Sequence, residues 1–129
     1  MLKMYKNSKK QGDAGMGIAI GWFCGNGYNV SIPLTDSQDY DLVVEINNIL
    51  KKVQVKTTTY KKKSNIYQVF LKTCGGNKSG TGKTKLFNWE SSDYLFIVTS
   101  DEDKYIIPTF PSMPKNTLNL GEQYQQYKV

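Results

Sequence analysis

Apolar and polar residues alternate through two neighbouring segments, residues 41–46 and 49–56, and this period of two predicts a β-hairpin. Both segments are rich in β-branched side chains, and Asn47-Asn48 separates them. Two asparagines suit the left-handed backbone dihedrals of a two-residue hairpin turn. The sequence therefore predicts the two strands together with the turn that joins them.

The predicted turn fixes which side chains share a face of the hairpin. With Ile46 opposite Ile49, cross-strand pairing places Asp41 opposite Gln54. Lys56 then lies diagonally beside this pair, on the same side of the sheet. We therefore expect a carboxylate, an amide and an ammonium group to converge there.

The other face of the predicted hairpin carries aliphatic residues at every second position, which is typical of a stripe that faces a core. These residues are Leu42, Val44, Ile46, Ile49, Val53 and Val55. A register shift of one residue would bury the polar groups and expose the aliphatic ones, so the register is strongly specified. The alternative interpretation is an ordinary half-buried hairpin whose polar residues are merely solvated.

Before the hairpin, a glycine-rich segment over residues 11–24 predicts a helix that is capped at Gly12 or Asp13 and stopped by Gly25-Asn26-Gly27. Glycine inside a helix costs about 1 kcal/mol relative to alanine. Close packing of the helix against the sheet is the expected compensation. Residues 1–10 show no periodic pattern and are expected to form a loose N-terminal arm.

The remaining segments predict strands and loops that complete an α/β (α+β) domain. In order, they are a strand at 28–33, a polar loop at 34–40, an extension of the second hairpin strand to about residue 60, a strand at 66–72, a Gly/Lys/Ser/Thr loop at 73–88, a strand at 94–100, an edge strand at 105–108 and a short helix at 118–129. The length of 129 residues fits one domain, residues 1–129, with 111–129 as a C-terminal tail.

Composition excludes several classes of function. The sequence has no histidine, which removes Ser-His-Asp and Cys-His catalysis and histidine-ligated zinc. Cys24 and Cys74 have no metal-ligand spacing, so reduced thiols are expected. No signal peptide and no apolar run of about 18 residues is present, so we expect no membrane partner and a cytoplasmic location, in a bacterial or phage-infected cell, or an organellar one.

Basic charge is concentrated in the middle of the chain. Ten lysines and no acidic residue lie between Ile46 and Trp89, whereas the rest of the chain has seven lysines and eleven acids. Such polarity favours a polyanionic partner, above all nucleic acid, although a solvated lysine-rich face is the alternative. The expected phosphate contacts are Lys61, Lys62, Lys63, Lys78, Lys83 and Lys85.

The segment at residues 80–84, GTGKT, is similar to the end of a phosphate-binding loop. The motif requires a glycine five residues before Gly82, where this chain has Asn77. Too little chain follows it to supply a parallel sheet. A lysine loop that touches DNA phosphates fits this segment better than nucleotide hydrolysis does.

The hairpin constellation has the chemistry of phosphodiester hydrolysis. Asp41, the amide oxygen of Gln54 and the Val55 carbonyl are hard oxygen ligands of the kind that Mg²⁺ or Mn²⁺ prefers. A divalent cation offsets charge on the reacting phosphorus and activates water, and Lys56 would position or stabilise the attacking hydroxide.

Residues 11–108 resemble the family of PD-(D/E)XK nucleases. The arrangement typical of that family is an N-terminal helix, a strand, an Asp, a hairpin and then (Asp/Glu/Gln)-x-Lys. Among its members, the chain is most similar to the small homing endonucleases that group I introns encode. The segments that carry the resemblance are GDAG at residues 12–15, GYNV at 27–30, YDLVV at 40–44 and VQVKT at 53–57.

The resemblance implies a restriction-endonuclease-like core, in which helices flank a mixed β-sheet around a central catalytic β-hairpin. It also implies Mg²⁺-dependent, site-specific cleavage of double-stranded DNA by a homodimer or homotetramer, with Asp41, Gln54 and Lys56 as catalytic residues. Many relatives carry an acidic residue in the first helix where this chain has Met16. Asp13 and Asp39 are the candidates to replace that metal ligand.

Two other functions remain open at this point. One is a DNA-binding module of the same fold without catalytic activity, which Met16 favours. The other is a Holliday-junction or repair nuclease, which shares the chemistry but recognises the shape of DNA. A cleavage assay with Mg²⁺ distinguishes an active endonuclease from the inactive module, because the module binds DNA without cutting it. Cutting at one site of linear DNA, as opposed to cutting only branched DNA, distinguishes the site-specific endonuclease from the junction or repair nuclease.

Overall fold

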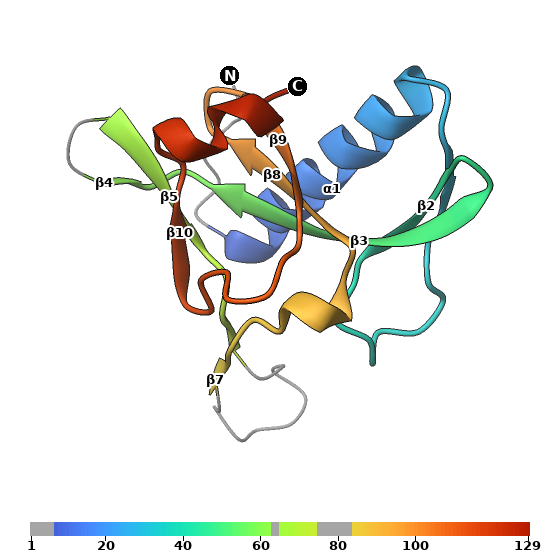
Figure 1. The fold of residues 1–129 in the computed structure, drawn as a ribbon, viewed down its shortest axis with the longest axis horizontal. Helices are drawn as coiled ribbons and strands as arrows, with labels where there is room; N and C mark the ends of the chain where they lie inside the picture. The colour runs from blue at the N-terminus through green and yellow to red at the C-terminus, as the bar shows by residue number, and fades with distance from the viewer. Residues whose placement is uncertain (1–6, 63–64, 75–83) are drawn as a thin grey trace.

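The computed structural model of the protein describes residues 7–62, 65–74 and 84–129. In these ranges a long helix, a five-stranded sheet and a three-stranded sheet are stacked in three layers (Figure 1). No α-helix in the described ranges has the length and apolar character that crossing a membrane requires.

The helix α1 spans Ser8–Gly25 and begins earlier than the sequence predicted. Asn7 is its N-cap, and the Asn7 side chain accepts a hydrogen bond from the Lys9 backbone N–H at 2.9 Å. Asparagine is among the strongest N-caps because its side-chain oxygen satisfies an N–H of the first turn that has no partner within the helix. The predicted cap at Gly12 or Asp13 is therefore wrong.

The earlier start of α1 also corrects the predicted N-terminal arm. Residues 8–10 are helical, so they are not part of a loose arm, and residues 1–6 lie outside the described part of the chain. The predicted end of the helix is confirmed, because α1 stops at Gly25 and Gly27 adopts a φ of +86°. Glycine reaches this left-handed region at little cost.

The central sheet has the order β1-β2-β3-β8-β9. These strands are β1 Asn29–Ser31, β2 Leu42–Ile46, β3 Ile49–Thr58, β8 Tyr94–Thr99 and β9 Lys104–Pro108. The sheet is mixed, since β3 runs parallel to β8 and the other neighbours are antiparallel.

The predicted hairpin register is confirmed. Ile46 pairs with Ile49 and Leu42 pairs with Val53 across β2 and β3. Asn47 and Asn48 have φ angles of 52° and 63°, the left-handed values that a two-residue turn of this kind requires.

A second sheet of three strands, in the order β10-β5-β4, packs on the face of the central sheet opposite α1. Its strands are β4 Lys61–Lys62, β5 Ile66–Phe70 and β10 Thr117–Asn119. The smaller elements are β6 Thr73–Cys74 paired with β7 Thr84–Lys85, and the 3₁₀ helices η2 Trp89–Ser91 and η3 Glu122–Tyr127.

These elements correct two predictions near the C-terminal half. The segment at 73–88 is not a loop throughout, because the pair β6–β7 falls within it, and helix η2 begins directly after it at Trp89. The segment at 118–129 is helical only over Glu122–Tyr127, as a 3₁₀ helix, and its first residues belong to β10. Strand β10 pairs with β5, a long-range partner that local sequence does not reveal.

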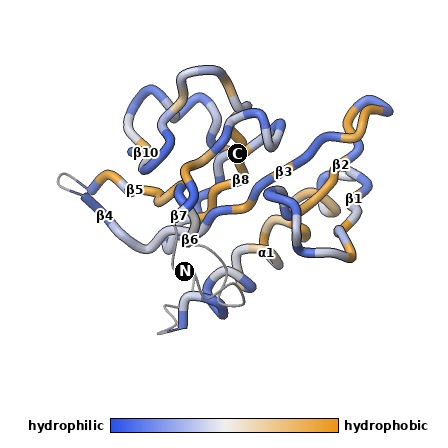
Figure 2. The backbone as a smooth tube through the Cα atoms, turned by 90° about the horizontal axis from the view of Figure 1, so that it is seen from below, coloured by the Kyte–Doolittle hydropathy of each residue, from blue (hydrophilic) through white to orange (hydrophobic). Residues whose placement is uncertain are grey.

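The middle of the central sheet is covered on both faces, whereas β3 is exposed where it follows the hairpin turn. On one face α1 covers a core cluster around Phe23, Leu42, Val53 and Phe96. On the other face the second sheet and η3 cover a cluster that includes Leu95 and residues of β5 and β10. In Figure 2, the strands β3 and β8 lie between α1 on one side and β10 on the other. The second sheet and η3 thus partly cover the polar face of the hairpin, which the sequence did not predict.

The predicted aliphatic stripe of the hairpin is confirmed except at the turn. Leu42, Val44 and Val53 are fully buried, and Ile46 and Val55 pack against the same cluster. Ile49 was also predicted to face the core, but 56% of its surface is exposed. Ile49 follows the Asn47-Asn48 turn directly, at the end of the hairpin farthest from the buried pair Leu42 and Val53.

One of the helix glycines compensates for its cost by close packing. A Cβ atom at Gly15 would overlap Thr57 Oγ1 of β3, so only glycine lets α1 approach the sheet here. A Cβ at Gly12, Gly17 or Gly21 would meet nothing within 4 Å. The predicted compensation therefore holds at Gly15 and not at the other three.

This difference predicts opposite effects for two glycine substitutions in α1. Gly17→Ala should raise the free energy of unfolding by up to about 1 kcal/mol, because alanine favours the helix and fits the open space. Gly15→Ala should lower it by about 1 kcal/mol or more, since overpacking against Thr57 outweighs that gain. Urea unfolding of the two variants measures both, and equal effects would contradict the close approach.

Candidate active site

Asp41 lies immediately before β2, with its carboxylate fixed against the neighbouring strand. Asp41 Oδ2 accepts a hydrogen bond from the Val55 backbone N–H at 2.7 Å, and the Asp41 backbone N–H donates to the Val53 carbonyl at 2.9 Å. The side chain thus satisfies a backbone donor of β3. This contact holds the carboxylate beside the residue that follows Gln54.

Gln54 is a buried amide with an unsatisfied oxygen. The residue is only 7% exposed, and its Oε1 has no hydrogen-bond partner. Among the described residues, Ser92 Oγ is the other buried side-chain atom of this kind. A buried acceptor without a donor costs about 1–3 kcal/mol. Such an atom calls for a partner that the polypeptide does not supply, and a cation is one that an amide oxygen can ligate.

Lys56 is half-buried on the same face of β3 and interacts electrostatically with Asp41. Burial lowers the pKa of Lys56 from its ordinary value, and the attraction of Asp41 partly opposes this. Burial likewise raises the pKa of Asp41. The hydrogen bond from Val55 and the positive charge of Lys56 lower this pKa but do not cancel the effect of burial. The acid and the amine are therefore close enough to influence each other's ionisation.

The predicted trio of Asp41, Gln54 and Lys56 is thus brought together on one face of the sheet. Asp41 and the unsatisfied Gln54 oxygen, with the Val55 carbonyl, fit a hard divalent cation such as Mg²⁺. The described residues contain no cluster of three or more His, Cys, Asp or Glu side chains that could hold a metal ion. Among the described residues, Asp41 is the carboxylate whose contacts place it at this site.

The candidates for an additional ligand have different surroundings. Met16 packs against the core cluster beneath α1. Asp13 is exposed on α1, the helix that covers the face of the sheet opposite Gln54. Asp39 makes an ion pair with Lys85 at 2.8 Å.

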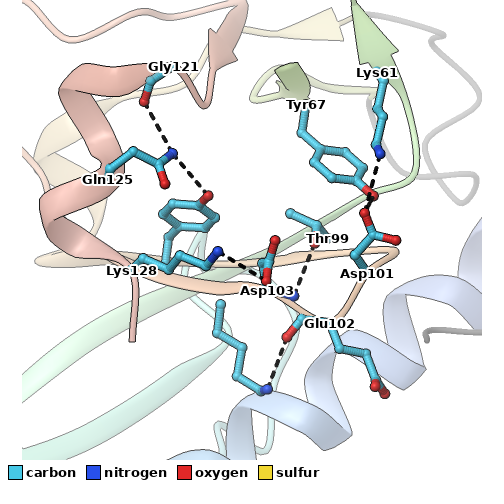
Figure 3. Close-up of polar contacts among 11 residues, drawn as sticks. Lys61, Tyr67, Thr99, Asp101, Glu102, Asp103, Gly121, Gln125 and Lys128 are labelled. Atoms are coloured by element: carbon cyan, nitrogen blue, oxygen red, sulfur yellow. Dashed lines mark hydrogen bonds and ion pairs between the residues drawn. The ribbon is translucent and has the colours of Figure 1, made fainter. Parts of the chain in front are cut away.

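The predicted DNA-contacting lysines have different surroundings. Lys61 makes an ion pair with Asp101 at 3.3 Å and lies over the Tyr67 ring, 4.9 Å from its centre (Figure 3). Lys62 is exposed and has no ion-pair partner within the described ranges. Lys85 is exposed and holds Asp39. Lys63, Lys78 and Lys83 lie outside the described residues.

The Asp39–Lys85 contact joins a metal-ligand candidate to a phosphate-contact candidate. Both oxygens of Asp39 accept from the Lys85 ammonium, at 2.9 and 2.8 Å. An exposed pair of this kind contributes only about 0–1 kcal/mol, so a phosphate can displace it at little cost. The contact also holds β7 beside the loop that leads to Asp41.

Thr58 is a residue of this region that sequence reasoning missed. It is 3% exposed, its Oγ1 donates to the Gln68 carbonyl at 2.6 Å, and the same oxygen accepts from the Tyr60 N–H at 3.3 Å. Its spacing from Gln54 and Lys56, at positions 54, 56 and 58, is the signal that places it on their face of β3. Thr58 ties the strand of the candidate site directly to the second sheet.

Comparison with known proteins agrees with this geometry. A family model described as PD-(D/E)XK endonuclease matches residues 6–125. A solved structure described as that of a bacterial homing endonuclease, I-Ssp6803I, aligns with a TM-score of 0.72 and 26% sequence identity, over 93% of this chain and 82% of that chain.

Two further comparisons add nothing to this. The structure of MepB aligns over 98% of this chain and 97% of its own, with a TM-score of 0.49 and 16% identity, a likeness too weak to bear on function. A search of curated protein sequences gave no match.

The family match covers nearly the whole chain and includes the hairpin and its polar trio. The chain therefore belongs to the PD-(D/E)XK endonuclease family.

Proposed function

We propose that this chain is a Mg²⁺- or Mn²⁺-dependent homing endonuclease that makes a site-specific double-strand break in DNA. The observation that carries the proposal is the unsatisfied, buried oxygen of Gln54 on the face of the sheet that also carries the Asp41 carboxylate. A stable protein keeps such an atom at a cost, and a bound cation removes that cost. The likeness to a bacterial homing endonuclease supports the same function.

Each residue of the site would have a different role in hydrolysis. Asp41, Gln54 Oε1 and the Val55 carbonyl would hold the divalent cation, which supplies charge neutralisation at phosphorus and a more acidic bound water. Lys56 Nζ, half-buried and with a lowered pKa, places a positive charge or a proton donor next to this site. The Val55 N–H keeps the Asp41 carboxylate in its orientation.

DNA would approach over the basic part of the chain. The ten lysines between Ile46 and Trp89 include Lys56 and the candidates Lys61, Lys62, Lys63, Lys78, Lys83 and Lys85. Phosphate contacts from lysine give sequence-independent affinity that weakens with salt. Lys61 and Lys85 would exchange Asp101 and Asp39 for phosphate, which costs little because both ion pairs are exposed.

A double-strand break requires two sites. Each chain carries one Asp41–Gln54–Lys56 trio, so two copies that face each other are the minimum for cutting both strands. A homodimer, or a homotetramer built from two dimers, is therefore part of the proposal.

The first test removes the lysine of the site. Lys56→Ala should lower the rate of plasmid cleavage in Mg²⁺ by about 100-fold or more, because a group that stabilises the transition state is lost. Lys115→Ala removes an exposed lysine outside the basic segment and should cut like the wild type. A wild-type protein that binds the plasmid but leaves it intact would contradict the proposal in favour of an inactive DNA-binding module.

The single carboxylate predicts weak metal binding in the absence of DNA. Calorimetric titration of the free protein with Mg²⁺ should give little binding, because charge on the ligands sets the affinity for hard cations. Gln54→Glu adds a second carboxylate at the same position and should tighten Mg²⁺ binding about tenfold or more. Tight binding to the wild type, or no difference between the two proteins, would count against the site.

Burial of Asp41 predicts a particular dependence of stability on pH. Because burial raises its pKa in the native state above the ordinary value of 3.8, the folded protein holds the proton more tightly than the unfolded chain. The contribution of Asp41 to stability should therefore fall as the pH rises from about 3.8 through the raised pKa. Asp41→Asn should lose this component, and urea unfolding across this range, with Asp36→Asn as the exposed control, measures the difference.

A further inference from the structure

The outer face of the three-stranded sheet gathers polar and aromatic side chains. Along β5, Tyr67 and Val69 point inward and are buried, so Gln68 and Phe70 point outward. The register with β10 and β4, and the Gln68 N–H bond to the Tyr60 carbonyl, bring further residues to the same side. We name this surface the amide–aromatic face, and it consists of Tyr60, Lys62, Gln68, Phe70, Thr117 and Asn119.

Two amides are paired at the centre of this face. Gln68 and Asn119 lie directly opposite each other in the register, and Gln68 Nε2 donates to Asn119 Oδ1 at 3.0 Å. The pair leaves one amide oxygen and one amide nitrogen to make outward bonds, and this holds whichever way the two amides are turned. One acceptor beside one donor is the complement of the adenine edge in the major groove, where N6 donates and N7 accepts.

Two aromatic rings flank the amide pair. Tyr60 and Phe70 are 51% and 54% exposed, and their ring centres lie 6.0 Å apart. Exposed aromatic rings that touch each other without joining the core mark a contact surface. Next to a reader of adenine, an apolar ring meets the C5-methyl group of the paired thymine.

Charge and shape agree with a duplex as the occupant. Strands β4 and β5 lie within the basic segment, and Lys62 on this face has no ion-pair partner in the described part of the chain. Lys61, on the other side of β4, is already held by Asp101 (Figure 3). The major groove, about 12 Å wide, admits two paired strands, and β5 and β10 form such a pair at Gln68 and Asn119.

The amide–aromatic face is rigidly connected to the candidate active site. Thr58 Oγ1 in β3 binds the Gln68 carbonyl, and Thr58 is two residues from Lys56. Two residues of a strand span about 7 Å. The backbone that carries Gln68 is therefore fixed relative to the strand that carries Lys56, as a base reader must be to define where the cut falls.

We infer that the amide–aromatic face reads sequence in the major groove, with the Gln68–Asn119 pair recognising an A·T base pair and Phe70 and Tyr60 contacting the thymine methyl group. This inference rests on the proposed function and extends it from cleavage to the choice of site. Lysine phosphate contacts cannot supply that choice, because they carry no sequence information.

The test is the base preference of cleavage. A library of DNA duplexes with a randomised central region is cut by the wild type in Mg²⁺, and the cut molecules are sequenced. We expect an A·T preference at one or more positions, and Gln68→Ala and Asn119→Ala should each reduce it about tenfold at the same position and not elsewhere. Gln126→Ala, the same kind of change on η3, should leave the preference unaltered.

A second arm leaves the protein unchanged. In a duplex of the preferred sequence, 7-deazaadenine at the recognised position removes the N7 acceptor alone and should lower cleavage about fivefold or more. Wild-type cleavage that responds neither to this change nor to the two variants would overturn the inference while the proposed function stands. A wild type that cuts no member of the library would overturn the proposed function itself.

Discussion

The register of β2 against β3 is the constraint on which the rest of this structure depends. The left-handed dihedrals of Asn47 and Asn48 set it, and aliphatic residues that pack under α1 hold it. A slip by one residue would turn Gln54 and Lys56 toward the helix and separate them from Asp41. Because the same pairing that builds the core also builds the site, the chemistry is fixed by hydrophobic packing on the reverse side of the sheet.

The site shows how a second layer changes the properties of polar groups. The sheet β10-β5-β4 and η3 partly cover the face that carries Gln54 and Lys56, so these side chains lose water. Loss of water raises the pKa of Asp41, lowers that of Lys56 and leaves Gln54 Oε1 unsatisfied. Each effect disfavours the fold, and perturbed polar groups of this kind are common at functional sites.

Thr58 links this site to the surface that would choose the DNA sequence. The residue is buried between the two sheets, and its hydroxyl bonds the backbone of β5. The two proposals place affinity, sequence choice and cleavage on three sets of residues: the lysines, the amide–aromatic face and the hairpin trio. A chain of 129 residues would thereby combine all three functions.

The sequence alone determined the hairpin, its register, the end of α1 and the convergence of Asp41, Gln54 and Lys56, because each follows from turn chemistry and from a period of two within one short segment. It misplaced the start of α1, since the helix begins at the Asn7 cap, upstream of Gly12 and Asp13, which were the caps considered. The pairing of β10 with β5, the exposure of Ile49 and the contacts of Asp39 and Lys61 were decided by tertiary structure. These depend on which distant segments meet, and a local pattern carries no information about a partner more than 40 residues away, such as Asn119 for Gln68.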